Sequence, residues 1–288
     1  MGMPRVSAAI ITHNRAHFLP GAIASVLGQT YRDLELIVVD DGSTDDTEEA
    51  IAPYRDRIRY VRRHHGGKAA ARNAAVQLAE GELIAFCDSD DQWYPDRLER
   101  QLTAYADTPH AGMVHGHVDV IDESGRALRE WTSEQRALFS AAHREQPTYA
   151  SYAFNCCCLS STILVRREVF EHVGLYDLEL PIEDYDFYLR LVLEFDVLFL
   201  EGPPLARYRV HDEGTKAATL GAGQIRTAEK HLALLEEHPD IPDARIARQN
   251  FNLMIAQTWR VLGDRRRARA AAFRALRLGA PRGIRLAL

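Results

Sequence analysis

A chain of 288 residues, of which 46% are hydrophobic and 26% charged, has the composition of a globular protein with a sizeable core. These values exclude a collagen-like, coiled-coil or mostly disordered chain. Its longest apolar runs have the length of strands, so we expect neither a transmembrane helix nor a secretory signal. The four cysteines form no disulfide framework, which favours a reduced, cytoplasmic protein.

The formal charge of −6 is unevenly distributed. Residues 256–288 contain nine arginines, one aspartate and no lysine, a charge of +8, so the rest of the chain carries −14. This arginine-rich tail is either a solvated helix face or a contact with an anionic membrane surface. Nucleic-acid binding is not expected, because the chain is acidic as a whole and contains no recognition module.

Strands and helices alternate in the first hundred residues. Apolar runs bounded by turn residues predict strands at 6–12, 34–40, 58–61 and 83–87. Helical spacing and capping residues predict helices at 19–29, from Ser43 or Thr44 to about residue 54, at 68–79 and at 97–106. This order predicts an α/β fold with a parallel, doubly wound sheet.

The alternation is less regular after residue 107. Residues 113–121 and the segment after them suggest a hairpin in a mixed sheet, and residues 133–147 a loop or partial helix over the site. We expect further strands at 162–165, 197–200 and 206–210, and helices at 167–172 and 183–194. From Gln224 onward the pattern is helical, with a turn at Gly263 and Asp264.

Polar clusters follow three of the predicted strands or lie beside their ends: Thr12-His-Asn-Arg15, Asp40-Asp41 and Asp88-Ser-Asp90. In an open α/β sheet, ligands bind beyond the carboxyl ends of the strands. The chain has neither the glycine pattern of a dinucleotide site nor that of a P-loop. Clustered carboxylates repel a polyphosphate unless a divalent cation accompanies it, which favours diphosphate binding through a metal. In an extended chain Asp88 and Asp90 point to the same side, as two hard oxygen ligands suited to Mg²⁺ or Mn²⁺.

Several motifs then resemble those of one enzyme family, in order and spacing, between about residues 6 and 211. In the first half they are Thr12-His-Asn-Arg15, Val39-Asp-Asp-Gly-Ser-Thr-Asp45, Gly66 with Ala71-Arg-Asn73, Phe86-Cys-Asp-Ser-Asp-Asp-Gln-Trp93 and Pro95-Asp-Arg-Leu98. In the second half they are Val165-Arg-Arg-Glu-Val-Phe170, Gly174-Leu-Tyr-Asp177, Glu183-Asp-Tyr-Asp-Phe-Tyr-Leu-Arg190 and Tyr208-Arg-Val-His211. The chain thus resembles the family 2 glycosyltransferases, whose fold is called GT-A.

The resemblance implies transfer of a sugar, with inversion, from a nucleoside-diphosphate sugar to an acceptor hydroxyl. It also implies a nucleotide-sugar site and a divalent metal, Mn²⁺ or Mg²⁺, held by Asp90 and Asp88 and reached by His211. The residues implied in nucleotide-sugar binding are Thr12, Asn14, Arg15, Asp41, Arg72, Asp88 and Ser89. Asp41 would bind the nucleobase. UDP or dTDP is favoured over GDP, since uracil and thymine offer an N3–H to a carboxylate, although guanine also offers a donor edge.

An inverting transfer needs one carboxylate that accepts the proton of the attacking hydroxyl. Asp184 matches the family's base position, and the start of the predicted 183–194 helix favours its ionised form. Glu183 is the second choice, and Asp186 is a candidate for binding an acceptor hydroxyl. Trp93 either borders the sugar or belongs to the core. Asp91 is interpreted as a turn or capping acid.

We therefore expect a GT-A domain over residues 1–215, with a nucleotide-sugar half (1–106) and an acceptor half (107–215). An arginine-rich helical extension would occupy residues 216–288. The expected setting is bacterial surface polysaccharide or glycolipid synthesis on a glycan or lipid-linked acceptor, in the cytoplasm or at the inner face of the membrane. Two alternatives stay open: a catalytically silent nucleotide-sugar-binding scaffold and a sugar-1-phosphate nucleotidyltransferase.

Overall fold

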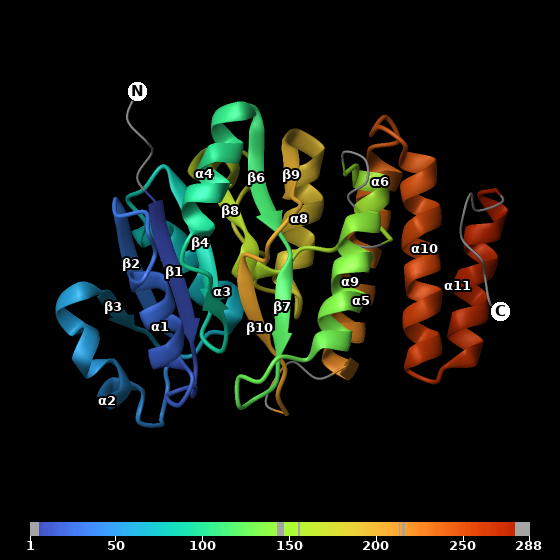
Figure 1. The fold of residues 1–288 in the computed structure, drawn as a ribbon. Coiled ribbons are helices and arrows are strands. Elements are labelled where there is room, and N and C mark those ends of the chain that lie inside the picture. The colour runs from blue at the N-terminus through green and yellow to red at the C-terminus, as the bar shows by residue number, and fades with distance from the viewer. Residues whose placement is uncertain (1–5, 143–146, 155, 213, 215–216, 280–288) are drawn as a thin grey trace. The chain divides into compact units, whose positions relative to one another are not determined.

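A computed structural model describes residues 6–142, 147–154, 156–212, 214 and 217–279 (Figure 1). The chain divides into two compact units. The sheet unit comprises Met1–Gln146, Cys157–Leu178 and Glu194–Gly214, and the helical unit comprises Pro147–Cys156, Glu179–Leu193 and Thr215–Leu288. The division of the sequence at residue 215 into a catalytic domain and an extension stays a prediction.

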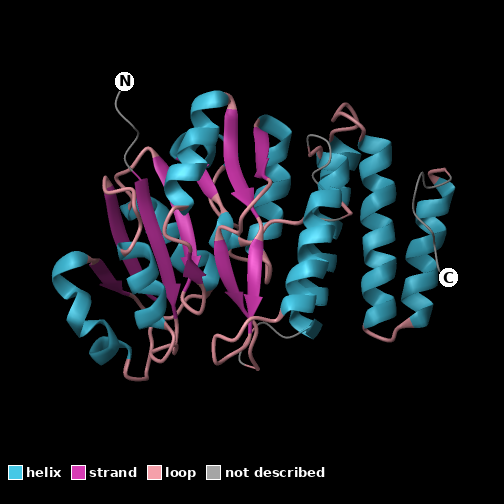
Figure 2. Cartoon of the chain, in the orientation of Figure 1, coloured by secondary structure: helices cyan, strands magenta, loops and turns pink. Residues whose placement is uncertain are grey.

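The sheet unit contains two sheets (Figure 2). The larger has the strand order β3-β2-β1-β4-β8-β6-β9 and the smaller the order β5-β10-β7. The strands are β1 (Val6–Thr12), β2 (Leu34–Asp40), β3 (Arg59–Arg62), β4 (Leu83–Asp88), β5 (Gln92–Trp93), β6 (Ala111–Gly116), β7 (Val118–Ile121), β8 (Leu164–Arg166), β9 (Asp196–Leu200) and β10 (Ala206–Arg209). Strand β8 is antiparallel to both β4 and β6, so the large sheet is mixed. A mixed sheet was predicted for the part of the chain after residue 107.

The first four strands are parallel and end together. Thr12 at the end of β1 is in register with Asp40, and Asp40 in turn with Arg62 of β3. On the other side of β1, Ile11 is paired with Asp88. The carboxyl ends of β1, β2 and β4 therefore form one edge, at which the predicted nucleotide-sugar residues gather.

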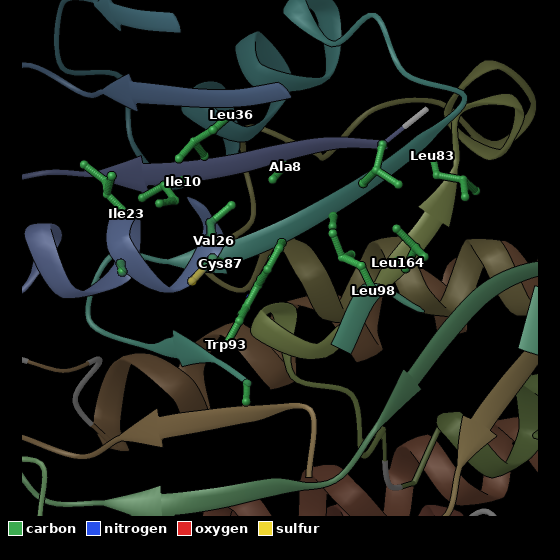
Figure 3. Packing of buried hydrophobic residues seen from close by; sticks show 14 of the residues in the cluster. Ala8, Ile10, Ile23, Val26, Leu36, Leu83, Cys87, Trp93, Leu98 and Leu164 are labelled. Carbon is green, nitrogen blue, oxygen red and sulfur yellow. The ribbon is translucent and has the colours of Figure 1, made fainter. Parts of the chain in front are cut away.

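Helices cover both faces of this sheet. Those of the sheet unit are α1 (Leu19–Leu27), α2 (Thr47–Ile51), η1 (Ala52–Arg57), α3 (Lys68–Leu78), α4 (Arg97–Asp107), α5 (Arg129–Ala142), η2 (Ser160–Thr162) and α7 (Arg167–Val173). Alternate residues of β1, among them Ala8 and Ile10, pack with Ile23 and Val26 of α1 in one hydrophobic core (Figure 3). Helix α3 packs on β1 and β2 from behind in the view of Figure 1.

The helical unit is built from α6 (Tyr149–Tyr152), α8 (Glu183–Glu194, of which the last residue belongs to the sheet unit), α9 (Ala217–Glu237), α10 (Ala244–Val261) and α11 (Arg265–Arg277). Helix α10 packs against α6, α9 and α11. The predicted turn at Gly263 and Asp264 is confirmed, and Asp264 caps α11 by accepting a hydrogen bond from the Arg267 N–H at 2.9 Å. None of the helices in the described ranges is both long enough and apolar enough to cross a membrane.

Several sequence-based predictions of local structure differ from the structure. Helix α2 begins at Thr47 rather than at Ser43 or Thr44, because both residues bond to Asn14 while Asp45 accepts hydrogen bonds from Thr47. The 113–121 segment is broken at His117, so that β6 and β7 lie in different sheets. Only the turn after Ile121, with its bridge to Ala127, resembles the predicted hairpin.

Of the segment 133–147, expected as a loop or partial helix, residues 133–142 belong to the helix α5, and residues 143–146 lie outside the described ranges. The strand expected at 162–165 is preceded by η2 and extends over Leu164–Arg166. The helical region begins at Ala217, seven residues before the predicted Gln224.

Candidate functional site

Asp41 lies at the carboxyl edge, immediately after β2, and is buried. Its two carboxylate oxygens accept hydrogen bonds from the backbone N–H groups of Gly66 (3.0 Å) and Gly67 (2.8 Å). Arg63 and His65 contact the same carboxylate at 3.6 and 2.8 Å. Gly67 directly precedes α3 with a φ of +87°, so this carboxylate supplies the acceptor that the helix N-terminus otherwise lacks. The nucleobase role of Asp41 stays a prediction.

Polar side chains join the loop after β1 to the loop after β2. Asn14 has a φ of +51°, in the left-handed region that asparagine tolerates. Its N–H donates to the Ser43 Oγ at 2.9 Å, and its Oδ1 accepts from the Thr44 N–H at 2.7 Å. Thr12 is buried and accepts the Asp41 N–H at its carbonyl. Asn14 thus fixes the shape of both loops, and the imidazole rings of His13 and His65 stack beside them at 4.3 Å.

Asp88 at the end of β4 forms an ion pair with Arg72 of α3, Nη2 to Oδ1, at 3.0 Å. The Arg72 guanidinium is buried and lies 5.8 Å from the ring centroid of Phe86 and 5.6 Å from that of Tyr176. Burial alone would raise the pKa of Asp88, but the charges of Arg72 and Lys68 outweigh it and hold the pKa below its ordinary value. The edge therefore presents an ionised carboxylate together with a fixed cation. The nucleotide-sugar roles of Asp88 and Arg72 stay predictions.

Asp90 meets residues from both ends of the sheet unit. Its Oδ2 lies 2.9 Å from the His211 Nε2 and 4.0 Å from the Arg15 Nε. Arg209 bonds through its Nε to the Asp90 carbonyl and through its N–H to the Asp91 carboxylate, both at 2.8 Å. The segment after β10 is thereby held against the turn after β4, and His211 is almost fully buried there.

Ser89 and Asp91, the residues on either side of Asp90, are buried. Burial and the neighbouring charges of Asp90 and Asp88 raise the pKa of Asp91 well above its ordinary value. Its hydrogen bond from Arg209 makes it a turn acid, consistent with the sequence interpretation. The binding role predicted for Ser89 stays a prediction.

Trp93 belongs to the hydrophobic core, with only 4% of its surface exposed. The Arg97 guanidinium lies over its ring at 3.8 Å and bonds to the carbonyls of Ser161 and Ile163. Of the two interpretations of Trp93, the structure supports the core role, and a contact with the sugar stays a prediction.

The donor set of Asp90 and His211 fits a divalent metal in part. One carboxylate oxygen and one imidazole nitrogen approach within 2.9 Å, and an N/O pair suits Mn²⁺. Within the described ranges, however, no three His, Cys, Asp or Glu side chains converge as a metal site. A metal held by these two residues therefore needs further ligands from substrate oxygens or water, as is usual for Mg²⁺ and Mn²⁺ at phosphate sites.

The proposed catalytic acids lie in the first turn of α8, in the helical unit. The Tyr185 N–H donates to the Asp184 Oδ1 at 2.8 Å, and Glu183 is buried. Asp186 has no exposed side-chain surface, and Arg190, Lys230 and His231 bind its oxygens. Its predicted contact with an acceptor hydroxyl, like the roles of Asp184 and Glu183, stays a prediction.

Four side chains that contact the candidate site residues were not identified from the sequence. Arg209 lies inside a motif that the sequence offered, but only the fold shows that it binds the turn after β4. His65 adjoins the glycine pair that precedes α3. Lys230 and His231 lie in a helix whose sequence gave no functional signal, because their partner Asp186 is about 45 residues away in the chain.

Comparisons with known proteins agree with this geometry. The profile of Glycosyl transferase family 2 matches residues 7–174. An uncharacterized glycosyltransferase of Rickettsia typhi, RT0329, is 30% identical over 227 residues, which are 75% of this chain and 67% of the relative. The uncharacterized Nostoc glycosyltransferase alr2836 is 32% identical over 59% of this chain and 53% of its own length, so the match spans about half of that relative. The Escherichia coli UDP-Glc:alpha-D-GlcNAc-diphosphoundecaprenol beta-1,3-glucosyltransferase WfgD is 26% identical, with shares of 84% and 89%.

Solved structures show the same fold. TarS of S. aureus (residues 1–349, in complex with UDP-GlcNAc) has a TM-score of 0.67 and 18% identity, covering 96% of this chain and 82% of TarS. The mannosyltransferase PcManGT of Pyrobaculum calidifontis, in complex with GDP-Man and Mn²⁺, has a TM-score of 0.65 and 21% identity, covering 98% and 77%. The mixed sheet with flanking helices is thus of the GT-A type. With more than half of its length matched by the family profile, the chain belongs to Glycosyl transferase family 2.

Proposed function

We propose that this protein transfers a sugar from a nucleoside-diphosphate sugar to an acceptor hydroxyl, with inversion at the transferred carbon. The observation that carries the proposal is the edge formed by β1, β2 and β4, where the Asp88–Arg72 pair lies close in sequence to the Asp90–His211 pair. Anionic metal ligands and a fixed cation together suit a diphosphate with its divalent ion.

Asp90 and His211 would hold the metal, and Asp88 with Arg72 would face the diphosphate. A bound Mn²⁺ or Mg²⁺ supplies charge neutralisation of the departing nucleoside diphosphate, so no protein acid is required for that group. The hydrogen bond between Asp90 and His211 keeps the carboxylate oxygen of one side by side with the ring nitrogen of the other. Because these residues are only two ligands, we expect the metal to bind tightly only together with the nucleotide.

Asp184 is proposed as the base, with Glu183 as the second choice. In an inverting transfer the acceptor oxygen attacks the sugar carbon while a carboxylate takes its proton. Asp184 lies in the first turn of a twelve-residue helix, beside the positive end of the helix dipole.

The donor is proposed to carry uracil or thymine, and the acceptor to be a glycan or lipid-linked sugar of a bacterial surface polysaccharide or glycolipid. WfgD, whose name describes a glucosyltransferase acting from UDP-Glc on a diphosphoundecaprenol-linked sugar, supports this setting. The two structural neighbours are complexed with UDP-GlcNAc and GDP-Man, so the fold accommodates both kinds of base.

We also propose that α11 contacts an anionic membrane surface. Arg266, Arg269 and Arg277 are exposed at helical spacing around Phe273, whose side chain is 63% exposed, and α11 contains no acidic residue. Arg282 and Arg285 of the predicted tail lie outside the described residues. Sedimentation with phosphatidylglycerol vesicles is expected to bring the protein down, and an Arg269→Glu, Phe273→Ser variant to remain in solution. Arg57→Glu, on an exposed site of η1, is the matched control, and equal binding to phosphatidylcholine would overturn the contact.

Calorimetric titration of UDP, dTDP and GDP, each with Mn²⁺ and with EDTA, tests the main proposal. We expect UDP or dTDP to bind only with Mn²⁺, and Asp90→Asn to abolish that binding. Asp56→Asn, an exposed acid of η1, should bind like the unaltered protein. Failure of folded protein to bind any nucleotide would overturn the proposal in favour of a scaffold, whereas binding that EDTA does not weaken would overturn only its metal part.

A further inference from the structure

The first turn of α8, which contains the proposed base, is anchored by an ionic cluster around the buried Asp186, whose members come from three helices. We call it the Asp186 cluster: it consists of Asp186 and Arg190 of α8, Lys230 and His231 of α9, and Tyr149 of α6. We propose that His231 and Tyr149 are positioning residues for Asp184. This inference rests on the proposed function, because it assigns these residues a task in that reaction.

The contacts of Asp186 leave it no freedom to move alone. Its Oδ2 pairs with the Arg190 Nε at 2.9 Å, one helical turn along α8. Its Oδ1 accepts from the Lys230 Nζ at 2.7 Å and from the His231 Nε2 at 3.1 Å. Burial would raise the pKa of Asp186, but the His231 hydrogen bond and the cations outweigh it and hold the pKa well below its ordinary value. Asp186 therefore stays ionised and bound.

His231 is held in one tautomer. Burial lowers its pKa in spite of the adjacent Asp186, so the imidazole is neutral and carries one proton. The Tyr149 Oη lies 2.9 Å from the His231 Nδ1, and burial raises the pKa of Tyr149, so the phenol keeps its proton and donates it to Nδ1. The imidazole proton then lies on Nε2, where it points at Asp186.

The residue next to Asp186 is also fixed. The Tyr185 hydroxyl donates to the carbonyls of Tyr152 and Ala153, both at 3.2 Å, and α6 is joined to α10 by Asn250, which bonds to the Ala150 carbonyl at 2.7 Å. Two consecutive residues that directly follow Asp184 are thus bound to other helices. Because the direction of a Cα–Cβ bond follows from its backbone, these anchors fix the direction in which the Asp184 side chain leaves the helix.

This arrangement gives α6 and α9 a function beyond packing. A reacting group displaced by about 1 Å can lose about 10²-fold in rate, although every substrate contact remains. Loss of the His231–Asp186 hydrogen bond should therefore lower kcat and leave the KM for the donor unchanged.

Two substitutions of His231 separate this role from simple packing. The amide of Gln reaches the place of Nε2 and can still donate to Asp186, whereas the amide of Asn reaches only the place of Nδ1. We expect His231→Asn to lower kcat about tenfold or more at unchanged KM. His231→Gln should stay within about twofold of the unaltered protein. His238→Asn, an exposed histidine near the end of α9, is the control.

The assay measures release of nucleotide from UDP-glucose, UDP-N-acetylglucosamine and GDP-mannose with Mn²⁺, water serving as the acceptor. The same substitutions are repeated in an Asp184→Asn background, where His231→Asn should cost nothing further if it acts through Asp184. Hydrogen exchange of the α8 peptide provides a readout without activity, and we expect faster exchange in His231→Asn but not in His231→Gln.

Faster exchange with unchanged kcat would overturn the positioning role. An equal loss of kcat in His231→Asn and His231→Gln would also overturn it. So would a loss of kcat from His231→Asn that is equally large in the Asp184→Asn background. Unchanged exchange in His231→Asn would overturn the anchor itself. Absence of nucleotide release from the unaltered protein, or full activity of Asp184→Asn, would instead count against the proposed function, while the exchange data still decide the anchor.

Discussion

Asp41 and Asp90 lie at the same edge of the sheet but differ in what binds their carboxylates. Asp41 is bound mainly by the backbone N–H groups of Gly66 and Gly67, which have no charge to lose and no rotamer to change. Asp90 is bound by the side chains of His211 and Arg15, which can turn away or take a new partner. We propose on this basis that an acidic motif contains residues of two kinds: one kind, here Asp41, holds the loop, and the other, here Asp90, would exchange its partner for a ligand.

The same substitution at both positions separates the two kinds. We expect Asp90→Asn to lower nucleotide-sugar turnover by roughly 10²-fold or more, because the loss of a metal ligand removes several kcal/mol of charge stabilisation. Its melting temperature should stay close to that of the unaltered protein, since the side chain is partly exposed. Initial rates at saturating donor, with a melting curve for each sample, provide the measurement. A large fall in stability would remove the distinction.

Asp41→Asn should have the opposite profile. An amide has only one acceptor oxygen, so its NH₂ group would face one of the two glycine N–H donors and leave it unbonded. We expect a loss of about 1–3 kcal/mol in the free energy of unfolding, the cost of one buried unsatisfied donor. Urea unfolding measures it, with the exposed Asp46→Asn as the control. If stability is unchanged but nucleotide affinity falls, Asp41 is instead a ligand of the kind predicted from the sequence.

The Asp186 cluster extends the comparison to a carboxylate that is bound by an imidazole, that of His231. Burial lowers the pKa of His231, so below about pH 6.5 the unfolded chain binds a proton that the folded chain does not. The free energy of unfolding is therefore not reduced by His231 above that pH. Below it, the free energy of unfolding falls with the pH by at most about 1.4 kcal/mol per pH unit.

His231→Gln removes this titration, so its melting temperature should fall less between pH 7 and pH 5 than that of the unaltered protein. The difference is expected to be roughly 2–4 °C per pH unit or less. A thermal melt series at constant ionic strength measures it, and His238→Gln should follow the unaltered protein. Parallel pH curves for His231→Gln and the unaltered protein would show that another group dominates.

Local signals were enough to predict elements of both units. The strand at Val6–Thr12 and the helix at Glu183–Glu194 are confirmed to the residue, because an uninterrupted apolar run and a helical stripe each define their own ends. Where the outcome depended on distant partners the predictions failed. Ser43 looked like a helix cap, but Asn14 uses its hydroxyl. The break at His117 depends on which strands pair with β6 and β7, which no local pattern contains.

The candidate site shows the same division. Asp88 and Asp90 were recognisable because they follow a buried strand, and Arg72 because it follows a glycine pair at a helix start. The partners of Asp41 and Asp186 were not, since a carboxylate in a sequence does not reveal whether backbone, lysine or imidazole will surround it. Only the three-dimensional path of α9 brings His231 to Asp186.

The contact between His211 and Asp90 has a consequence for biosynthesis, since 121 positions separate the two residues. At a translation rate of about 5–20 residues per second, roughly 6–24 s pass between their incorporation. Throughout that interval the nascent chain presents the acidic turn without its histidine and without Arg209. The metal site that we propose thus cannot be completed on the growing N-terminal half, and acquisition of the ion becomes a late event that follows synthesis of almost the whole sheet unit.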